Sequence, residues 1–387
     1  MKLADRMSRL GTETAFEVLA RAKQLEKKGK DIIHLEIGEP DFDTPKNIKE
    51  AAIKALNDGY THYGPSAGLP EVREVIAQYV SKTRKINAKP EQVVVTPGAK
   101  PIMFFSILAL ANEGEEVIYP NPGFPIYESV INFVGAKAVP IKLREENDFR
   151  LDTDELKKLV TDKTKLIIIN SPQNPTGGVL TKDDLKVIAD ITLSKDIMVL
   201  SDEIYSRTLY DGEHHSISSF PGMQEKTIIL DGMSKTYAMT GWRLGYGVMR
   251  EDLAVLVAKL QTNSNSCTAS FTQRAGIEAL TGSQDEADKM VAEFKKRRDV
   301  IVKGLNSIPK ISCKTPQGAF YVFPNIKQVG WNSKRLADHF LEEAGVAVLS
   351  GTSFGEYGEG YIRISYANSV ENIKKGLERI EKTLSKI

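Results

Sequence analysis

Short apolar runs alternate with amphipathic stretches through the middle of the chain, and this pattern constrains the fold most. The runs are rich in β-branched residues and bounded by Gly, Pro or Asn: Val93–Thr96, Glu116–Tyr119, Lys165–Ile169, Ile197–Ser201 and Thr227–Asp231. Helical patterns such as DELKKLV and KDDLKVIADI lie between them. This alternation predicts an α/β fold with a mostly parallel sheet, buried on both sides by helices.

The two ends of the chain have a different pattern. A long charged helical stretch follows residue 285, and PQGAFYVF and YIRISYA then alternate like half-exposed strands before a final helix. The 387 residues are too many for one ordinary domain. We therefore expect a second, smaller α+β unit.

Composition and charge exclude several classes of protein. The 52 Lys and Arg residues balance 51 Asp and Glu residues, which gives no electrostatic reason to bind nucleic acid or a membrane surface. The chain has no apolar run of about 18 residues and no signal-peptide pattern, so we expect a cytoplasmic protein. Its two cysteines, Cys267 and Cys313, are too few for a disulfide framework or a four-ligand zinc site, and no metal site is expected. A small-molecule enzyme is favoured.

The unusual chemistry lies just after the predicted strands, where open parallel sheets bind ligands. These segments are PGAK (97–100), NSPQNPTGG (170–178), SDEIYS (201–206) and GMSKTYAMTGWRLGY (232–246). In the last of them, Lys235 is surrounded by small and polar residues, and a lysine with a lowered pKa forms imines with carbonyl compounds. Taken singly, Lys235 reads as a surface charge and Asp202 as a cap residue. Together they suit pyridoxal phosphate, because Asp202 would keep the ring nitrogen protonated.

Other residues in these segments supply the remaining partners of such a cofactor. Tyr205 would share a helical face with Asp202 if a helix starts there, and it could hydrogen-bond the ring oxygen together with Asn174. The backbone of Gly98, Ala99 and Lys100 precedes a helical stretch and could bind the phosphate as an anion nest. Arg243 is the candidate charged phosphate ligand.

The segments GEPDFDTP, YTHYGPSAGLPEVRE, VTPGAK, NPGFPIY, INSPQNPTGG, SDEIYS, SKTYAMTGWRLGY, PQGAFYVF and YIRISYA, in this order, resemble the class I aminotransferases of fold type I. The likeness runs from about residue 10 to the C-terminus and is greatest to the branch with aspartate and aspartate/prephenate aminotransferases. It implies a seven-stranded, mostly parallel sheet in a large cofactor-binding domain (46–288). A small domain would combine residues 1–45 and 289–387.

The resemblance also implies roles at matching positions. Lys235 would hold pyridoxal phosphate as a Schiff base and transfer the protons, and Arg363 would bind the substrate α-carboxylate, helped by the backbone of Gly38. Lys100 would favour dicarboxylic substrates such as aspartate and glutamate. The remaining implied cofactor ligands are Asp202, Tyr205, Asn174, Arg243, Ser234, Gly98, Ala99, Phe124 as the residue stacked on the ring, and Tyr63 reaching the neighbouring subunit's cofactor. The last role implies a homodimer with shared sites. Where many relatives have a phosphate-binding Ser three residues before the lysine, this chain has Gly232.

Alternatives remain open within the same fold. They are aminotransferases specific for aromatic amino acids, alanine or other donors, and pyridoxal-phosphate lyases, decarboxylases or oxidases. A cofactor-binding regulatory domain would need a basic DNA-binding extension, which the sequence lacks. A nicotinamide dehydrogenase is disfavoured because the Gly245-Tyr246-Gly247 start meets Arg250 where a third glycine is needed.

Overall fold

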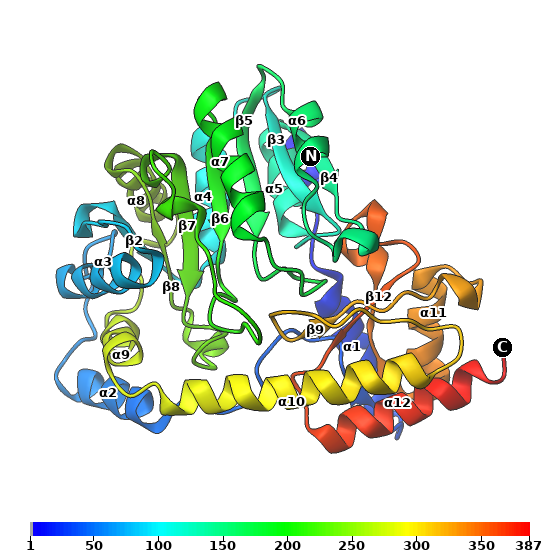
Figure 1. Cartoon of the computed structure of the whole chain (residues 1–387). Helices are drawn as coiled ribbons and strands as arrows, with labels where there is room; N and C mark the ends of the chain where they lie inside the picture. Colours follow the sequence, from blue (N-terminus) through cyan, green and yellow to red (C-terminus); the bar gives the residue numbers. More distant parts are fainter. Residues whose placement is uncertain (1–2) are drawn as a thin grey trace.

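The computed structural model describes residues 3–387 and is built around a seven-stranded sheet in the order β2-β8-β7-β6-β5-β3-β4 (Figure 1). The strands are β2 (Val93–Thr96), β3 (Glu116–Asn121), β4 (Lys137–Lys142), β5 (Thr164–Asn170), β6 (Met198–Asp202), β7 (Thr227–Gly232) and β8 (Gly245–Val248). β3 to β7 pair in parallel, and β8 is antiparallel to both β2 and β7. The mostly parallel sheet predicted from the sequence is confirmed.

Two strands of this sheet lie outside the predicted apolar runs. β4 contains Pro140 and is an edge strand, where a missing backbone donor is tolerated. β8 reads Gly-Tyr-Gly-Val, and two glycines in four residues lower its intrinsic strand preference. Tertiary packing forms both strands against local propensity.

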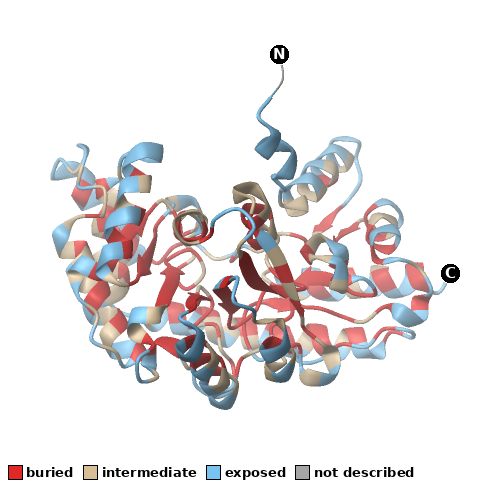
Figure 2. Cartoon of the chain, turned by 90° about the horizontal axis from the view of Figure 1, so that it is seen from above, coloured by how far each residue is buried: buried red, intermediate tan, exposed pale blue. Residues whose placement is uncertain are grey.

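Helices cover both faces of the sheet. They are α2 (Lys46–Asn57), α3 (Pro70–Arg84), α4 (Lys100–Leu110), α5 (Ile126–Val134), α6 (Thr153–Leu159), α7 (Lys182–Lys195), α8 (Glu251–Asn265) and α9 (Ser270–Thr281). Alternate strand residues point to opposite faces. Val94 and Ile168 pack with side chains of α4, α5 and α8, whereas Ile167 and Ile169 pack with those of α6 and α7. In Figure 2, buried residues fill the interior and exposed residues line the outer helices.

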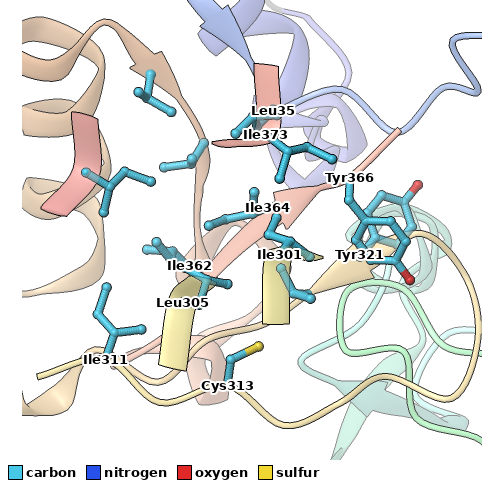
Figure 3. Close-up of a cluster of buried hydrophobic side chains, with 14 of the residues drawn as sticks. Leu35, Ile301, Leu305, Ile311, Cys313, Tyr321, Ile362, Ile364, Tyr366 and Ile373 are labelled. Atoms are coloured by element: carbon cyan, nitrogen blue, oxygen red, sulfur yellow. The ribbon is translucent and has the colours of Figure 1, made fainter. Parts of the chain in front are cut away.

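Both ends of the chain form a second core beside the sheet. Its elements are α1 (Thr14–Lys27), β1 (Ile33–His34), α10 (Asp285–Ser307), β9 (Tyr321–Val322), α11 (Ser333–His339), a π-helical turn (Phe340–Ala344), β10 (Val346–Ala347), β11 (Leu349–Ser350), β12 (Ile362–Ser365) and α12 (Val370–Leu384). β1 pairs in parallel with β10, and β11, β12 and β9 form an antiparallel sheet. Leu35 from the N-terminal part packs with Ile301, Ile364 and Ile373 from the C-terminal part (Figure 3).

The prediction that β9 and β12 are half-exposed is wrong, because every residue of both strands is buried. Ile362 and Ile364 face the second core. Arg363, which alternates with them, faces a cavity between the two cores. The polar position of Arg363 in the pattern therefore marks a cavity rather than solvent.

Helix α10 connects the two cores and runs along the lower part of the molecule in Figure 1. Met290 near its start packs with the residues of α3 and α9, and Leu305 near its end lies in the second core. Among residues 3–387, none of the helices combines the length and apolar character needed to cross a membrane.

Candidate active site

A cavity of about 600 Å³ lies where the carboxyl ends of the parallel strands meet the second core. Asn170 and Asp202 are register partners at the ends of β5 and β6, which places the segments that follow these strands along one edge. The cavity brings together most of the predicted site residues, namely Gly38, Ala99, Lys100, Phe124, Asn174, Asp202, Tyr205, Ser234, Lys235, Arg243 and Arg363. The remaining two predicted residues, Gly98 and Tyr63, do not line it.

Lys235 lies in a turn three residues after β7 and reaches into the cavity. Its Nζ donates a hydrogen bond of 2.6 Å to the carbonyl oxygen of Gly38. Burial lowers the pKa of Lys235 to about 8; the carboxylate of Glu39 opposes this decrease and the charge of Arg363 adds to it. A substantial fraction of this amine is therefore neutral near pH 8, as nucleophilic attack on a carbonyl or removal of a proton requires.

Asp202 ends β6 and faces the same cavity. Tyr127 Oη donates a 2.6 Å hydrogen bond to Asp202 Oδ2, and the backbone nitrogen of Ile204 donates to Oδ1 over 3.2 Å. Burial raises the pKa of Asp202 to about 6, even though both hydrogen bonds lower it. Within residues 3–387 this carboxylate forms no ion pair, so its environment suits a cationic ligand group. The sequence analysis missed Tyr127, although it lies three residues after Phe124 in NPGFPIY.

Tyr205 is brought to the cavity by turns rather than by the helix that the sequence suggested. Hydrogen bonds from Ser206 N to Glu203 O and from Thr208 N to Tyr205 O close these turns. Tyr205 Oη shares a 2.7 Å hydrogen bond with Tyr321 Oη. Tyr321 comes from β9 and was not predicted as a site residue.

Arg363 and Asn174 form another part of the cavity wall. Arg363 is only 4% exposed, and its Nη1 donates to Asn174 Oδ1 over 3.2 Å. Its Nη2 donates to the backbone carbonyl of Glu36, while Nε is buried without a partner. Burial lowers the pKa of Arg363, which lies over the rings of Tyr321 and Phe354. A buried guanidinium with an unfilled donor is suited to bind a carboxylate.

Gly38 and Tyr321 fit together closely beside Lys235. A Cβ at Gly38 would lie 2.1 Å from Tyr321 Oη, so a larger residue would displace that hydroxyl. The Gly38 carbonyl already accepts the hydrogen bond from Lys235. This backbone position therefore helps to place both groups.

The other end of the cavity lies between the start of α4 and the turn before β8. Gly98 has a φ of +83°, and a Cβ there would lie 2.2 Å from Arg243 Nη2. Arg243 Nη1 donates to the carbonyl of Thr240 over 2.9 Å, and Ser234 lines the same region. The free backbone N–H groups at the start of α4, together with this guanidinium, can hold an anion.

Gly232, the departure noted in the sequence, lies at a close contact between two strands. It pairs with Gly245 across β7 and β8, and a Cβ at Gly232 would lie 2.9 Å from the Cα of Gly245. The backbone of Leu244 is 3.1 Å from the same point. The close strand pairing leaves no room for a serine side chain without a shift of β8.

Lys100 begins α4 and forms an ion pair with Glu13, the residue before α1. Its Nζ also lies 5.4 Å from the centre of the Phe124 ring. Glu13 lines the cavity and was not predicted as a site residue. Tyr63, in contrast, is 90% exposed, away from the cavity lining of its own chain.

A buried ionic network supports the segments that carry the site. Arg84 of α3 donates to Glu203 Oε2 over 2.8 Å and to Asp231 Oδ2 over 2.6 Å. Its Nη2 also contacts Ser206 Oγ at 2.9 Å. Glu203 lies within the segment from Asp202 to Tyr205 and Ser206 directly follows it, while Asp231 lies four residues before Lys235. The network was missed because nothing in the sequence relates α3 to these strand ends.

No group of three or more His, Cys, Asp or Glu side chains in the described part of the chain is arranged to hold a metal ion. The centre of the candidate site consists of one half-buried lysine, one buried carboxylate, hydroxyl and amide groups, and two arginines. Such a set can hold an anionic cofactor and bind a carboxylate substrate beside it.

Comparisons with known proteins agree with this geometry. Residues 30–380 match the family described as aminotransferase class I and II. The chain is 46% identical to the aspartate aminotransferase of Pyrococcus abyssi, covering 92% of both chains. It is 42% identical to aromatic-amino-acid aminotransferase 2 of Thermococcus litoralis, covering 99% of this chain and 98% of the relative. The structure of Thermus thermophilus aspartate aminotransferase with maleate is similar with a TM-score of 0.95 and 35% identity, over 99% of this chain and 100% of that one. This chain therefore belongs to the family of class I and II aminotransferases.

Proposed function

We propose that this aminotransferase holds pyridoxal phosphate through Lys235 and moves an amino group between an L-amino acid and a 2-oxo acid. One observation carries the proposal. A half-buried lysine with a pKa lowered to about 8 and a buried carboxylate without a cationic partner in the described chain face the same cavity. The amine suits the cofactor's aldehyde, and Asp202 suits its pyridinium nitrogen.

The other residues of the cavity fit the remaining groups of this cofactor. The hydroxyl of Tyr205 and the amide of Asn174 are available for the ring oxygen, and Phe124 offers an aromatic face. For the phosphate, the backbone of Gly98 and Ala99 is supplemented by Ser234 and Arg243. Since a side chain at Gly98 would meet Arg243, this end is shaped for an anion held between backbone and guanidinium.

The proposed roles of the protein groups follow from their charge and position. When bound, pyridoxal phosphate supplies an electron-accepting ring that stabilises negative charge at the substrate α-carbon. Arg363 binds the α-carboxylate and orients the substrate. Lys235, once its amine is free, removes the α-proton of the substrate. The same amine then delivers a proton to the aldehyde carbon of the cofactor. Asp202 keeps its negative charge when a cation lies beside it, because the cation offsets the effect of burial.

We propose aspartate or glutamate as the amino donor, with Lys100 binding the distal carboxylate. The relatives named as aspartate aminotransferases support this choice. The relative named as an aromatic-amino-acid aminotransferase supports the alternative of an apolar donor, which Phe124 beside Lys100 could accommodate. Lyase or oxidase chemistry on the same cofactor remains a further alternative.

We also propose a homodimer with shared active sites, in which Tyr63 contacts the partner's cofactor phosphate. Tyr63 is 90% exposed in one chain, and the apolar residues Ile53 and Leu56 of α2 are exposed as well. These exposed side chains support an interface in which the partner subunit covers them. The proposed domains are 46–288 and 1–45 with 289–387, so that α10 continues across the boundary. A cytoplasmic location is part of the proposal and is in keeping with the free thiols Cys267 and Cys313.

Lys235→Ala tests the cofactor assignment. We expect loss of the visible absorbance of the lysine-bound cofactor and a decrease in transamination by several orders of magnitude, because the same amine binds the cofactor and transfers the proton. Lys186→Ala, which removes an exposed lysine of α7, is the control. Near-normal turnover of the Lys235 variant would refute the assignment.

An amino-donor panel tests the reaction and the donor class. Aspartate, glutamate, phenylalanine and alanine are each assayed with 2-oxoglutarate and with pyruvate as acceptor. Transamination requires that product formation depends on the acceptor. Release of a 2-oxo acid or an amine over many turnovers without any acceptor would instead indicate oxidase or lyase chemistry.

A further inference from the structure

An ion pair between distant parts of the chain lies in the wall of the active-site cavity. Glu13 is the last residue before α1, and Lys100 is the first residue of α4. Their side chains are 18% and 45% exposed, and both line the cavity that contains Lys235 and Arg363. The pair therefore lies in a part of the cavity wall that solvent can reach.

Glu13 differs in its partner from the other acidic residues that line this cavity. Asp202 accepts hydrogen bonds from Tyr127 and Ile204, and Glu39 accepts one from the hydroxyl of Thr240. Glu13 alone among these three forms an ion pair with a cation of the cavity wall. Its carboxylate thus lies where a carboxylate on a substrate side chain would meet Lys100.

The charge of Glu13 also reaches the groups at the reaction centre. Burial is the main cause that lowers the pKa of Lys235, and Glu13 is one of the two carboxylates that oppose this effect. Burial likewise lowers the pKa of Arg363, and Glu13 again opposes it. Neutralising Glu13 therefore changes the electrostatic potential at Lys235 and Arg363, and not only at the protein surface.

We propose that Glu13 determines substrate breadth by occupying Lys100 whenever the substrate has no side-chain carboxylate. The inference rests on the proposed transamination and on the proposed role of Lys100. With Glu13 in place, the apolar side chain of a substrate beside Phe124 meets the neutral Glu13–Lys100 pair. Without Glu13 it would meet an unpaired Lys100, and removing water from that cation would be costly. A dicarboxylic substrate replaces the Glu13 carboxylate on Lys100.

The structure allows such an exchange without rearrangement of the fold. Glu13 is the last residue of the irregular segment 10–13. Its side chain is partly exposed, so it can turn toward solvent. Lys100 is fixed through its backbone at the start of α4. The lysine therefore stays in place while the carboxylate bound to it changes.

Four variants of the holoenzyme test the proposal: Glu13→Gln, Lys100→Ala, the double variant, and Glu17→Gln as an exposed control on the same helix. The kinetic measurement is kcat/KM for aspartate and for phenylalanine with one acceptor. We expect Glu13→Gln to raise the value for aspartate and lower that for phenylalanine, each by about twofold to fivefold, the range for a partly exposed charge pair. In the Lys100→Ala background, Glu13→Gln should leave the ratio of the two values unchanged.

Equilibrium binding gives a second measurement that does not depend on turnover. Calorimetry with succinate and with 3-phenylpropionate compares a dicarboxylate with an apolar monocarboxylate. We expect Glu13→Gln to tighten succinate binding and weaken 3-phenylpropionate binding by a similar factor, with Glu17→Gln like the unsubstituted protein. Absence of transamination with every donor would contradict the proposed function. Equal effects of Glu13→Gln on both ligands, or none, would overturn the inference about Glu13.

Discussion

Replacing Arg84 by Met should destabilise the protein severely, because Arg84 neutralises two buried carboxylates. Its side chain is 3% exposed, and those of Glu203 and Asp231 are 1% and 6% exposed. Methionine fills part of the space but donates no hydrogen bond. Both carboxylates then lose their cation in a region that water does not reach.

The expected loss follows from this burial. Removal of one partner from a buried ion pair costs about 3–5 kcal/mol, and here one arginine serves two carboxylates. With an unfolding entropy of about 2.1 cal/mol/K per residue, each kcal/mol corresponds to roughly 1 °C in Tm for a chain of 387 residues, so we expect a decrease of about 5 °C. Arg274→Met, which removes the half-buried partner of Glu71, is the control and should cost less than about 1 kcal/mol.

The pH dependence identifies the cause. Burial by itself would raise the pKa of Glu203, but the charge of Arg84 and the hydrogen bonds from His214 and Ser216 hold this pKa below its ordinary value. Burial raises the pKa of Asp231 although Arg84 opposes this effect. Without Arg84, burial is less strongly opposed at both residues, so the folded-state pKa values of both carboxyl groups rise. The penalty is then greatest at high pH and decreases as the pH falls through the raised pKa values.

Thermal unfolding followed by far-UV circular dichroism at pH 8 and pH 5.5 measures this effect. The difference between Arg84→Met and the unsubstituted protein should be smaller at pH 5.5 by at least about 1 kcal/mol. The Arg274→Met difference should stay nearly constant. A loss that is independent of pH, or no larger than that of the control, would show that Arg84 does not act by neutralising Glu203 and Asp231.

Two further substitutions test the two ends of the cavity. Gly98→Ala should weaken binding of pyridoxal phosphate by about tenfold or more, because the new Cβ would meet Arg243 Nη2; titration of the cofactor-free protein measures this. Gly114→Ala introduces similar backbone strain at a φ of +80° with open space around the Cβ, and equal weakening by both would argue against the role of Arg243. Arg363→Leu should lower kcat/KM by roughly 100-fold or more for aspartate and phenylalanine alike, since both have an α-carboxylate. A loss confined to one donor would contradict that role.

Much of the site could be predicted because it lies at the ends of predictable strands. Lys235, Asp202 and Asn174 each follow an apolar run, and parallel strands place such positions along one edge. The family resemblance then added Arg363 and Lys100, which apolar patterns do not distinguish from surface residues. Both line the cavity in the structure.

Other parts of the site depend on contacts that no local pattern encodes. Tyr127 meets Asp202 across 75 residues, and Tyr321 meets Tyr205 across 116. Their sequence neighbourhoods are those of ordinary core aromatics. The helix on which the sequence argument for Tyr205 depended does not form, and turns carry this residue instead, because the spacing of three residues fits both structures.

The sequence by itself determined the parallel sheet and the edge of the sheet at which Lys235 and Asp202 line one cavity, since alternation of apolar runs is a local property that each segment carries. Only the tertiary structure decided that Glu13 neutralises Lys100 and that Arg84 lies between Glu203 and Asp231. It also decided that the alternating strand β12 faces a cavity and not water. The physical reason is that charge pairing and burial depend on distances between segments far apart in the chain, and folding alone sets these distances.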